Sequence, residues 1–431
     1  MKEKRTGKKD RKLLWGTIII SMILSLMVFY VLYNANNKYM TREEKAIHGI
    51  LYADGSYDSL PVYYLSREWE YYPDVLLTPG DDLEKYYFRY LSIGEYGGME
   101  LDARNGKPYG RGTYRLRIML PSEEHTYGLY LPEIFSAYNL YVDGKLIEQV
   151  GNPDPDHYEE RIQHRMFTFK GHTSVEIMIA VTNKDSASPG IQYVPAFGNP
   201  LKVNTVRGIP VFLNSSVFTL VLLVLLFSVW AFFRTRSRAN ALFAGVCVCV
   251  LGYTCYPLLH TYLALRVQPW FSLEMLFYYL TFPAMLLLEH EITGRKYKWV
   301  WWLVGFTAAA GIGATVAGIF AGGMETAALS YGVSAVTEVL KWFTAICLVV
   351  IAFFYTEGTR GLPLLAGTVL YASSLAADRI WPLYDPIIGG WFPEWGGTIL
   401  AGVFGVILWR ELTDGYRMRL IYEEQSRQME L

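Results

Sequence analysis

Five ionisable side chains stand out within long apolar segments of the sequence: Glu274, Glu338, Lys341, Asp378 and Arg379. Such residues usually face a bundle interior or a water-filled site, so each is a candidate for ligand binding or switching. Glu338 and Lys341 are three residues apart and can pair on one helix face, which would hold helices in register. Asp378 and Arg379 are adjacent, so they point about 100° apart and cannot both face one site. No chain of carboxylates crosses these segments, which disfavours a proton pump or transporter.

The polar segment 34–208 contains aromatic residues of the kind that a carbohydrate site needs. Such a site combines an aromatic face for the sugar ring with a few oriented polar groups. Trp69, Tyr114 and Tyr138 are the candidates for ligand binding, and Trp69 is the only tryptophan of the segment. Tyr114 and Tyr138 fall inside predicted strands, and packing in a β-sheet core is the preferred interpretation of all three.

Histidines and cysteines give no pattern for a metal site. His157, His164 and His172 are seven and eight residues apart and have no accompanying carboxylate pattern. The four cysteines all fall in apolar runs, so none can crosslink the polar segment, and their spacing does not suit zinc. We therefore predict neither a metal nor another cofactor.

The composition indicates a membrane protein. The chain of 431 residues is 52% hydrophobic and 18% charged, whereas soluble globular proteins are about a quarter charged. A formal net charge of -1 gives no indication of nucleic-acid binding. The aromatic content of 16% excludes a disordered or low-complexity chain.

Eight segments are apolar over a length that can cross a bilayer as a helix. One lies near the N-terminus, and seven follow one another after residue 208. They are 13–33, 210–233, 239–263, 269–290, 299–320, 332–355, 361–383 and 391–410.

These segments predict five parts of the chain. They are a cytoplasmic basic flank (1–12), an N-terminal anchor (13–33), an extracytoplasmic domain (34–208), a seven-span block (209–410) and a cytoplasmic signalling helix (411–431). The first span could instead be a cleaved signal peptide. A retained anchor is preferred because the span is long and Tyr33-Asn34-Ala35 is a poor cleavage site.

The distribution of lysine and arginine predicts the orientation, because basic residues favour the cytoplasmic side. Placing the basic flank on the cytoplasmic side puts 34–208 on the extracytoplasmic side, and the loops predicted to be cytoplasmic are then rich in basic residues. In chain order, the basic residues of these loops are Arg234, Arg236 and Arg238, then Arg295, Lys296 and Lys298, then Arg360, and finally Arg410, Arg417 and Arg419. Of the short outside loops, only the one after the third span carries a basic residue, Arg266.

Residues 34–208 have the alternating apolar and polar pattern of β-strands. Asp143-Gly144 between two such runs is a strong hairpin signal. The spacing of the strands suggests an antiparallel, all-β sandwich of jelly-roll type. The predicted strands are Thr113–Leu120, Tyr127–Leu131, Ala137–Val142, Leu146–Val150, Met166–Phe169 and Ser174–Val181.

Three segments, Arg67–Pro79 (REWEYYPDVLLTP), Gly112–Arg117 (GTYRLR) and Leu131–Gly144 (LPEIFSAYNLYVDG), resemble the extracellular jelly roll of a bacterial receptor family. That family is the seven-transmembrane receptors with diverse intracellular signalling modules, and the resemblance extends over nearly the whole chain. It implies a galactose-binding-like sandwich related to carbohydrate-binding modules, followed by the seven-span block. It also implies a homodimer whose last helix leads into an output module, often a histidine kinase or a cyclic-di-nucleotide synthase.

We therefore expect a receptor in the cell membrane that senses an extracytoplasmic ligand, with carbohydrate as one class, and relays it through seven helices. Residues 411–431 are too few for a catalytic module, so the chain as given is expected to be non-enzymatic. It is either the sensor part of a longer histidine kinase or signals through a separate cytoplasmic partner. The competing classes are a transporter or membrane enzyme with an accessory outer domain, and a structural envelope protein.

The predicted orientation can be tested on intact cells. Protease added outside should cut within 34–208 and leave a tag at the C-terminus uncleaved, because the two lie on opposite faces of the bilayer. Permeabilised cells provide the control in which both are cut. Protection of 34–208 in intact cells would contradict the orientation.

Overall fold

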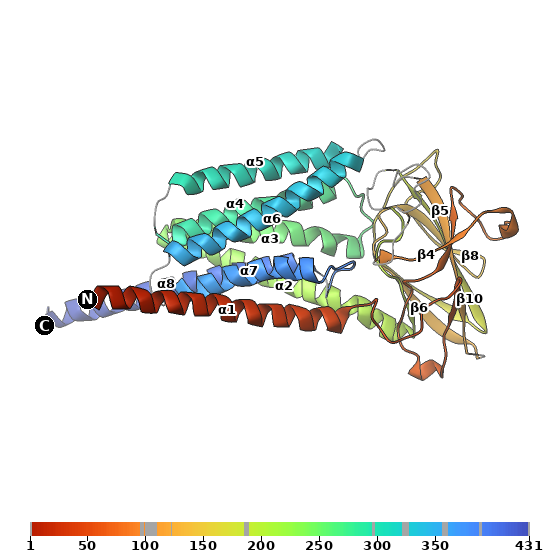
Figure 1. Ribbon diagram of the computed structural model, residues 1–431, viewed down its shortest axis with the longest axis horizontal. Helices are drawn as coiled ribbons and strands as arrows, with labels where there is room; N and C mark the ends of the chain where they lie inside the picture. Colours follow the sequence, from red (N-terminus) through yellow and green to blue (C-terminus); the bar gives the residue numbers. More distant parts are fainter. Residues whose placement is uncertain are drawn as a thin grey trace.

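The computed structural model describes residues 2–94, 99, 110–121, 123–184, 189–294, 298–320, 327–355, 361–387 and 390–429. The molecule has two parts placed end to end, a β domain and a bundle of helices (Figure 1). Both chain ends lie at the end of the bundle that is remote from the β domain. Arg295, Lys296 and Arg360, together with the side chain of Arg419, lie outside the described residues.

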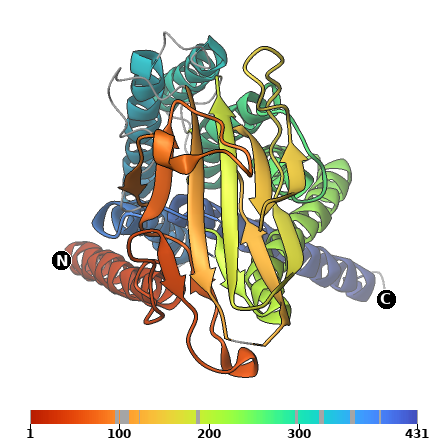
Figure 2. The ribbon, with the colours of Figure 1, turned by 90° about the vertical axis from the view of Figure 1, so that its right-hand side faces the viewer.

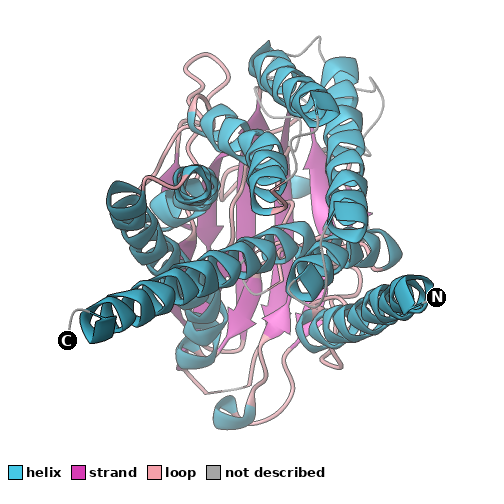
Figure 3. Ribbon diagram, turned by 90° about the vertical axis from the view of Figure 1, so that its left-hand side faces the viewer, coloured by secondary structure: helices cyan, strands magenta, loops and turns pink. Residues whose placement is uncertain are grey.

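The β domain contains two sheets. The larger has seven strands in the order β4-β3-β5-β10-β7-β8, with β1 added in parallel to β5. Its strands are β1 (Ile50–Tyr52), β3 (Trp69–Pro73), β4 (Arg89–Leu91), β5 (Gly110–Met119), β7 (Ala137–Val142), β8 (Lys145–Val150) and β10 (Ser174–Asn183). The smaller has the order β2-β11-β6-β9. Its strands are β2 (Tyr63–Tyr64), β6 (His125–Leu131), β9 (Arg165–Gly171) and β11 (Ala196–Gly198). Figure 2 shows the strands in front of the helices, and Figure 3 shows the opposite view.

The six strands predicted from alternation are confirmed as β5 to β10. The predicted hairpin between β7 and β8 is also confirmed, because these strands pair antiparallel around Asp143 and Gly144. Both turn residues have positive φ angles, 46° and 75°. A two-residue hairpin turn of this kind matches the twist of its strands, and Gly144 adopts that backbone conformation without strain.

A single apolar core lies between the two sheets. It includes Trp69, Tyr114 and Tyr138 from the larger sheet and Leu129 and Phe197 from the smaller one. Because residues of both sheets share one core, the domain is a sandwich of two sheets. Its more specific assignment as a galactose-binding-like jelly roll stays a prediction.

The bundle consists of eight helices in the described part of the chain. They are α1 (Lys2–Asn36), α2 (Pro200–Thr235), α3 (Arg238–Tyr262), α4 (Trp270–Ile292), α5 (Lys298–Phe320), α6 (Ala327–Tyr355), α7 (Leu362–Ile380) and α8 (Phe392–Met429). Seven of them are long and apolar enough to cross a membrane, which indicates a multi-pass membrane protein.

The eighth helix, α7, differs from the predicted span at 361–383. It has only 19 residues and is not among the helices long and apolar enough to cross a membrane. It packs against α1, α6 and α8, and its buried Thr368, Ser373 and Ser374 donate hydrogen bonds to carbonyl groups of α7 itself. A helix surrounded by others needs less apolar surface than one that faces lipid, because its polar groups are satisfied internally.

The helix α2 begins at Pro200 rather than at residue 210, so it starts inside the segment predicted to be the outer domain. The side chain of Asn199 caps it by accepting a hydrogen bond from the Leu201 N–H group at 3.0 Å, and Pro200 occupies its first turn. In this first part of the helix, Val203 is fully buried against Tyr130 of β6. The helix α2 therefore connects the β domain to the bundle without a flexible linker (Figure 1).

Two ion pairs that share Arg115 join three strands of the larger sheet. Arg115 of β5 donates to Glu70 of β3 at 2.7 Å and, through Nε, to Glu176 of β10 at 2.8 Å. The side chains of Arg115 and Glu70 are 14% and 7% exposed. Because removal of one partner leaves a buried charge without compensation, this pair is costly to break.

We expect Arg115→Ala to destabilise the β domain by about 3 kcal/mol, since Glu70 loses its closest counter-charge and keeps only the guanidinium group of Arg117 at 3.8 Å. Native-state proteolysis of the full chain in detergent should detect this as roughly 100-fold faster cleavage within the β domain. Lys170→Ala is the matched control, because the Lys170–Glu124 pair is exposed and contributes little. Equal cleavage of both variants would contradict the importance of the buried pair.

Candidate functional site

A strip of the β domain is hydrogen-bonded to the end of α3 and the loop that follows it. Ile162 and Leu265 exchange backbone hydrogen bonds at 2.7 and 3.2 Å, and the N–H group of His164 donates to the carbonyl of His260 at 3.2 Å. Gln163 Nε2 donates to the carbonyl of Tyr262. We call residues 159–164 and 260–266 together the junction. It holds the β domain against the helix ends.

A cavity of about 420 Å³ lies beside the junction, between the β domain and the bundle. The β domain contributes side chains that include Tyr64, Glu133 and Tyr193. The ends of five helices, α1, α2, α3, α4 and α8, contribute the remaining walls, together with the loop before α8. A cavity of this size suits a small molecule, and any molecule inside it touches both parts of the protein.

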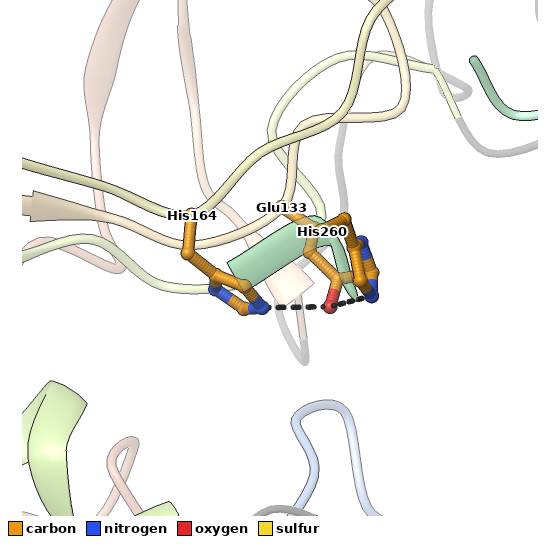
Figure 4. A group of neighbouring side chains, drawn as sticks. All are labelled: Glu133, His164 and His260. Atoms are coloured by element: carbon orange, nitrogen blue, oxygen red, sulfur yellow. Dashed lines mark ion pairs between the residues drawn. The ribbon is translucent and has the colours of Figure 1, made fainter. Parts of the chain in front are cut away.

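Three side chains converge within this cavity (Figure 4). His164 and His260 belong to the junction, and Glu133 lies just after β6. Glu133 Oε1 is 3.0 Å from His164 Nε2 and 3.5 Å from His260 Nε2. Burial alone would raise the pKa of Glu133, but His260 and His164 outweigh it and lower this pKa well below its usual value. The group is therefore a carboxylate facing two imidazole rings.

Aromatic neighbours fix the two imidazole rings. His164 Nδ1 is 2.8 Å from the hydroxyl oxygen of Tyr130. The ring of Tyr256 stacks on His260 with centroids 4.5 Å apart and an interplanar angle of 9°. His260 is only 1% exposed. Both rings are thus held by packing with one nitrogen, Nε2, directed at Glu133 (Figure 4).

Further charged groups line the same cavity. Asp385, in the loop between α7 and α8, is buried 3.7 Å from Lys38 Nζ. Burial raises the pKa of Asp385, although Lys38 acts in the opposite direction. Glu394 in the first turn of α8 accepts a hydrogen bond from the Trp391 N–H group at 3.0 Å, and both residues line the cavity. The first turn of α8 is therefore part of the site.

Of the residues proposed from the sequence, only Glu274 lines the cavity. Trp69, Tyr114 and Tyr138 are at most 1% exposed in the sandwich core, and the Trp69 indole donates to the carbonyl of Leu65. This placement agrees with core packing and leaves none of the three at the cavity.

The other intramembrane ionisable residues lie elsewhere in the bundle. Lys341 Nζ donates to Glu338 at 2.7 Å, so the two residues pair on one helix face as predicted. Glu338 is 49% exposed, and the role of the pair in helix register stays a prediction. Asp378 is half-buried and its neighbour Arg379 is exposed, as expected for adjacent positions of a helix. None of these four residues is part of the cavity wall.

Sequence reasoning missed the group formed by Glu133, His164 and His260. His164 was considered only together with His157 and His172, with which it shares no cluster among the described residues. Its partners are distant in the sequence, so spacing cannot reveal them. One signal was present, because His260 lies in the last turn of a predicted span, and ionisable residues at such positions are functional candidates.

Comparisons with known proteins identify no family for this chain. No family model matches it, and no curated protein matches its sequence. Among solved structures, a GH2 beta-galacturonidase from Eisenbergiella tayi bound to galacturonate is similar at 13% identity over 32% of this chain, with a TM-score of 0.24. A beta-glucuronidase from Faecalibacterium prausnitzii is similar at 12% identity over 32% of this chain and of its own length, with a TM-score of 0.23. The chain spans 24% of the galacturonidase. Similarity of this extent identifies neither a ligand nor an activity.

The pKa of Asp385 predicts a pH dependence of stability. A carboxyl group with a raised pKa binds its proton more tightly in the folded state, so it lowers stability progressively as the pH rises above 3.8, its ordinary value. Asp385→Asn should remove this loss. The melting temperature of this variant minus that of the unaltered chain should therefore be larger at pH 7.5 than at pH 4.5.

The exposed Asp156→Asn is the matched control for this measurement. The difference in melting temperature between this control and the unaltered chain should be the same at both pH values. If Asp385→Asn behaved in the same way as this control, burial of the Asp385 carboxyl would have no influence on stability.

Proposed function

We propose that this protein is a membrane receptor that binds a small extracytoplasmic ligand in the cavity between the β domain and the helices. One observation carries the proposal: the cavity walls come from both parts of the molecule. A ligand there contacts two bodies at once, so its affinity depends on how they are placed relative to each other. Differential affinity for two arrangements is the requirement for signalling, since tight binding alone transmits nothing.

The helix α8 supplies a path from the cavity to the other end of the bundle. Its first turn lines the cavity through Glu394, and it continues without interruption for 38 residues to Met429. At 1.5 Å per residue its length is about 57 Å, well beyond the ~30 Å of a bilayer core. A displacement at Trp391 and Glu394 would therefore reach the proposed cytoplasmic end as a movement of one rigid element.

The helices α2 and α3 have local features that favour such a movement. Each has an internal proline, Pro210 and Pro257 respectively, and both prolines line the cavity. An internal proline removes one backbone hydrogen bond and allows a helix to bend at that point. Bending of α2 and α3 at the cavity is thus the proposed mechanical response to the ligand.

The cavity chemistry suits a polar molecule that also has an apolar face. The cavity wall combines aromatic rings with carboxyl groups, imidazoles and basic groups, which is the pattern of a site with few oriented polar contacts. The aromatic residues are Tyr64, Tyr130, Phe135, Tyr193, Tyr256, Phe271 and Trp391. Carbohydrates have this character, and the resemblance of the sequence to a receptor family with a sugar-module-like domain makes them the first class to test.

The remaining parts of the proposal follow from the sequence. The basic flanks favour an extracytoplasmic β domain and a cytoplasmic C-terminal helix. The signal would pass to a cytoplasmic partner or to an output module joined to that helix, in a homodimer as in the family that the sequence resembles.

The proposal predicts that filling the cavity abolishes ligand response. A glycan and metabolite screen on the full chain in nanodiscs would first identify a stabilising compound. Asn214→Phe places a large side chain at the cavity wall. It should weaken the binding of that compound by at least about tenfold, equivalent to ~1.4 kcal/mol. Ser216→Phe, at an exposed position of the same helix, is the matched control and should bind normally.

The relay to α8 is measured separately. A photo-crosslinking amino acid at Arg417, an exposed position of α8, should change its crosslinking yield when the compound is added. The change should disappear in Asn214→Phe and persist in Ser216→Phe. Uptake of the compound into vesicles without a change in crosslinking would favour a transporter and contradict the receptor.

A further inference from the structure

The group formed by Glu133, His164 and His260 has the geometry of a metal site. All three ligand atoms lie within 4.8 Å of one another. In a tetrahedral zinc site with bonds of about 2.0–2.1 Å, neighbouring ligand atoms are separated by ~3.3 Å. The distances of 3.0 and 3.5 Å from Glu133 Oε1 to the two imidazole nitrogens lie on either side of this value. An ion could therefore enter with only small side-chain shifts (Figure 4).

The environment of His260 independently points to a missing ligand. Its side chain is 2% exposed, and its Nε2 lies 3.5 Å from Glu133 Oε1 without forming a hydrogen bond. Nδ1 also has no hydrogen-bond partner among the described residues. A buried polar group without a partner is unfavourable by about 1–3 kcal/mol and is uncommon in native proteins. Since His260 Nε2 faces Glu133 and the cavity, coordination of an ion would satisfy it.

The support of His164 is also typical of a metal ligand. A histidine that binds a metal through one nitrogen usually forms a hydrogen bond through the other, which fixes its tautomer and orientation. Here Tyr130 occupies that position, with its hydroxyl oxygen 2.8 Å from Nδ1. The hydroxyl oxygen of Tyr130 can accept a hydrogen bond from the Nδ1–H group of His164, which leaves Nε2 free to bind an ion.

We propose that Glu133, His164 and His260 bind a divalent transition metal ion of the zinc type. Two imidazoles and one carboxylate suit zinc, and three protein ligands leave the fourth tetrahedral position for water or a molecule in the cavity. Because two ligands belong to the β domain and His260 belongs to α3, the ion bridges the two parts of the protein.

Zinc binding to the full chain tests this site directly. The protein is purified in detergent with an affinity tag free of histidine, stripped with a chelator and titrated with zinc against a chromophoric competitor. We expect one zinc ion per chain. Glu133→Ala, His164→Ala and His260→Ala should each weaken zinc binding at least about 100-fold, and Tyr130→Phe roughly tenfold through loss of support to His164.

Matched controls are present in the same domain. His157 and Glu123 are exposed and do not belong to the group, so His157→Ala and Glu123→Ala should bind zinc like the unaltered chain. Absence of stoichiometric zinc binding, or equal weakening in these controls, would overturn the proposal. Thermal melts in chelator report whether each variant is folded before zinc is added.

A measurement on the unaltered chain avoids dependence on folded variants. X-ray absorption of the zinc-loaded protein should show two imidazole ligands in the first shell, and fewer than two would overturn the site. This inference does not rest on the receptor function. Zinc binding without any ligand response would support the metal site and contradict the receptor. A ligand response without zinc binding would support the receptor and contradict the metal site.

Discussion

The position of the β domain on the bundle depends on backbone hydrogen bonds at the junction. Ile162 and Leu265 pair as if in a sheet, and the backbone and side chains around them add further bonds between the same two strips. Such bonds are directional, so they fix both distance and orientation, which apolar contact alone would not do. The rigid entry of α2 into the β domain provides the second connection. Between these two connections the helix ends and the sandwich cannot close completely, and the cavity occupies the remaining space.

The proposed receptor function and the proposed metal site use this arrangement in different ways. The affinity of a ligand in the cavity would depend on the relative placement of the two parts. An ion bound to Glu133, His164 and His260 would restrict that placement. The two can therefore be coupled, since an ion that holds the junction also limits the arrangements available to a ligand. The cavity wall contains the first turn of α8, so both effects would act on this helix, which extends furthest from the β domain.

Much of the fold could be predicted because the local signals agree with the tertiary structure. The alternation of apolar and polar residues identified strands β5 to β10, and Asp143-Gly144 identified the hairpin between β7 and β8. Apolar length identified the helices. The start of α2 was missed because its first turns are polar on the outside and are stabilised by the Asn199 cap and by packing of Val203. The shortness of α7 was missed because hydropathy does not distinguish a helix that faces lipid from one that is enclosed by other helices.

The site could not be predicted in the same way, because it is assembled from distant segments. Glu133 follows β6, His164 precedes β9 and His260 ends α3, so only the docking of the β domain brings them together. Of the five intramembrane ionisable residues proposed from the sequence, only Glu274 lines the cavity. Aromatic content pointed to Trp69, Tyr114 and Tyr138, but in a tyrosine-rich sandwich the largest aromatic residues are needed to fill the core.

The packing of α1 has a consequence for biogenesis. This helix precedes the β domain in the sequence, whereas the helices it packs against come after it. It lies against α7, and Phe29 contacts Phe392 at the start of α8 with ring centroids 5.0 Å apart. The β domain and the helices α2 to α6 are therefore synthesised between α1 and these partners. The surface of α1 that packs against α7 and α8 stays uncovered until both have formed, so the bundle can close around α1 only after that point.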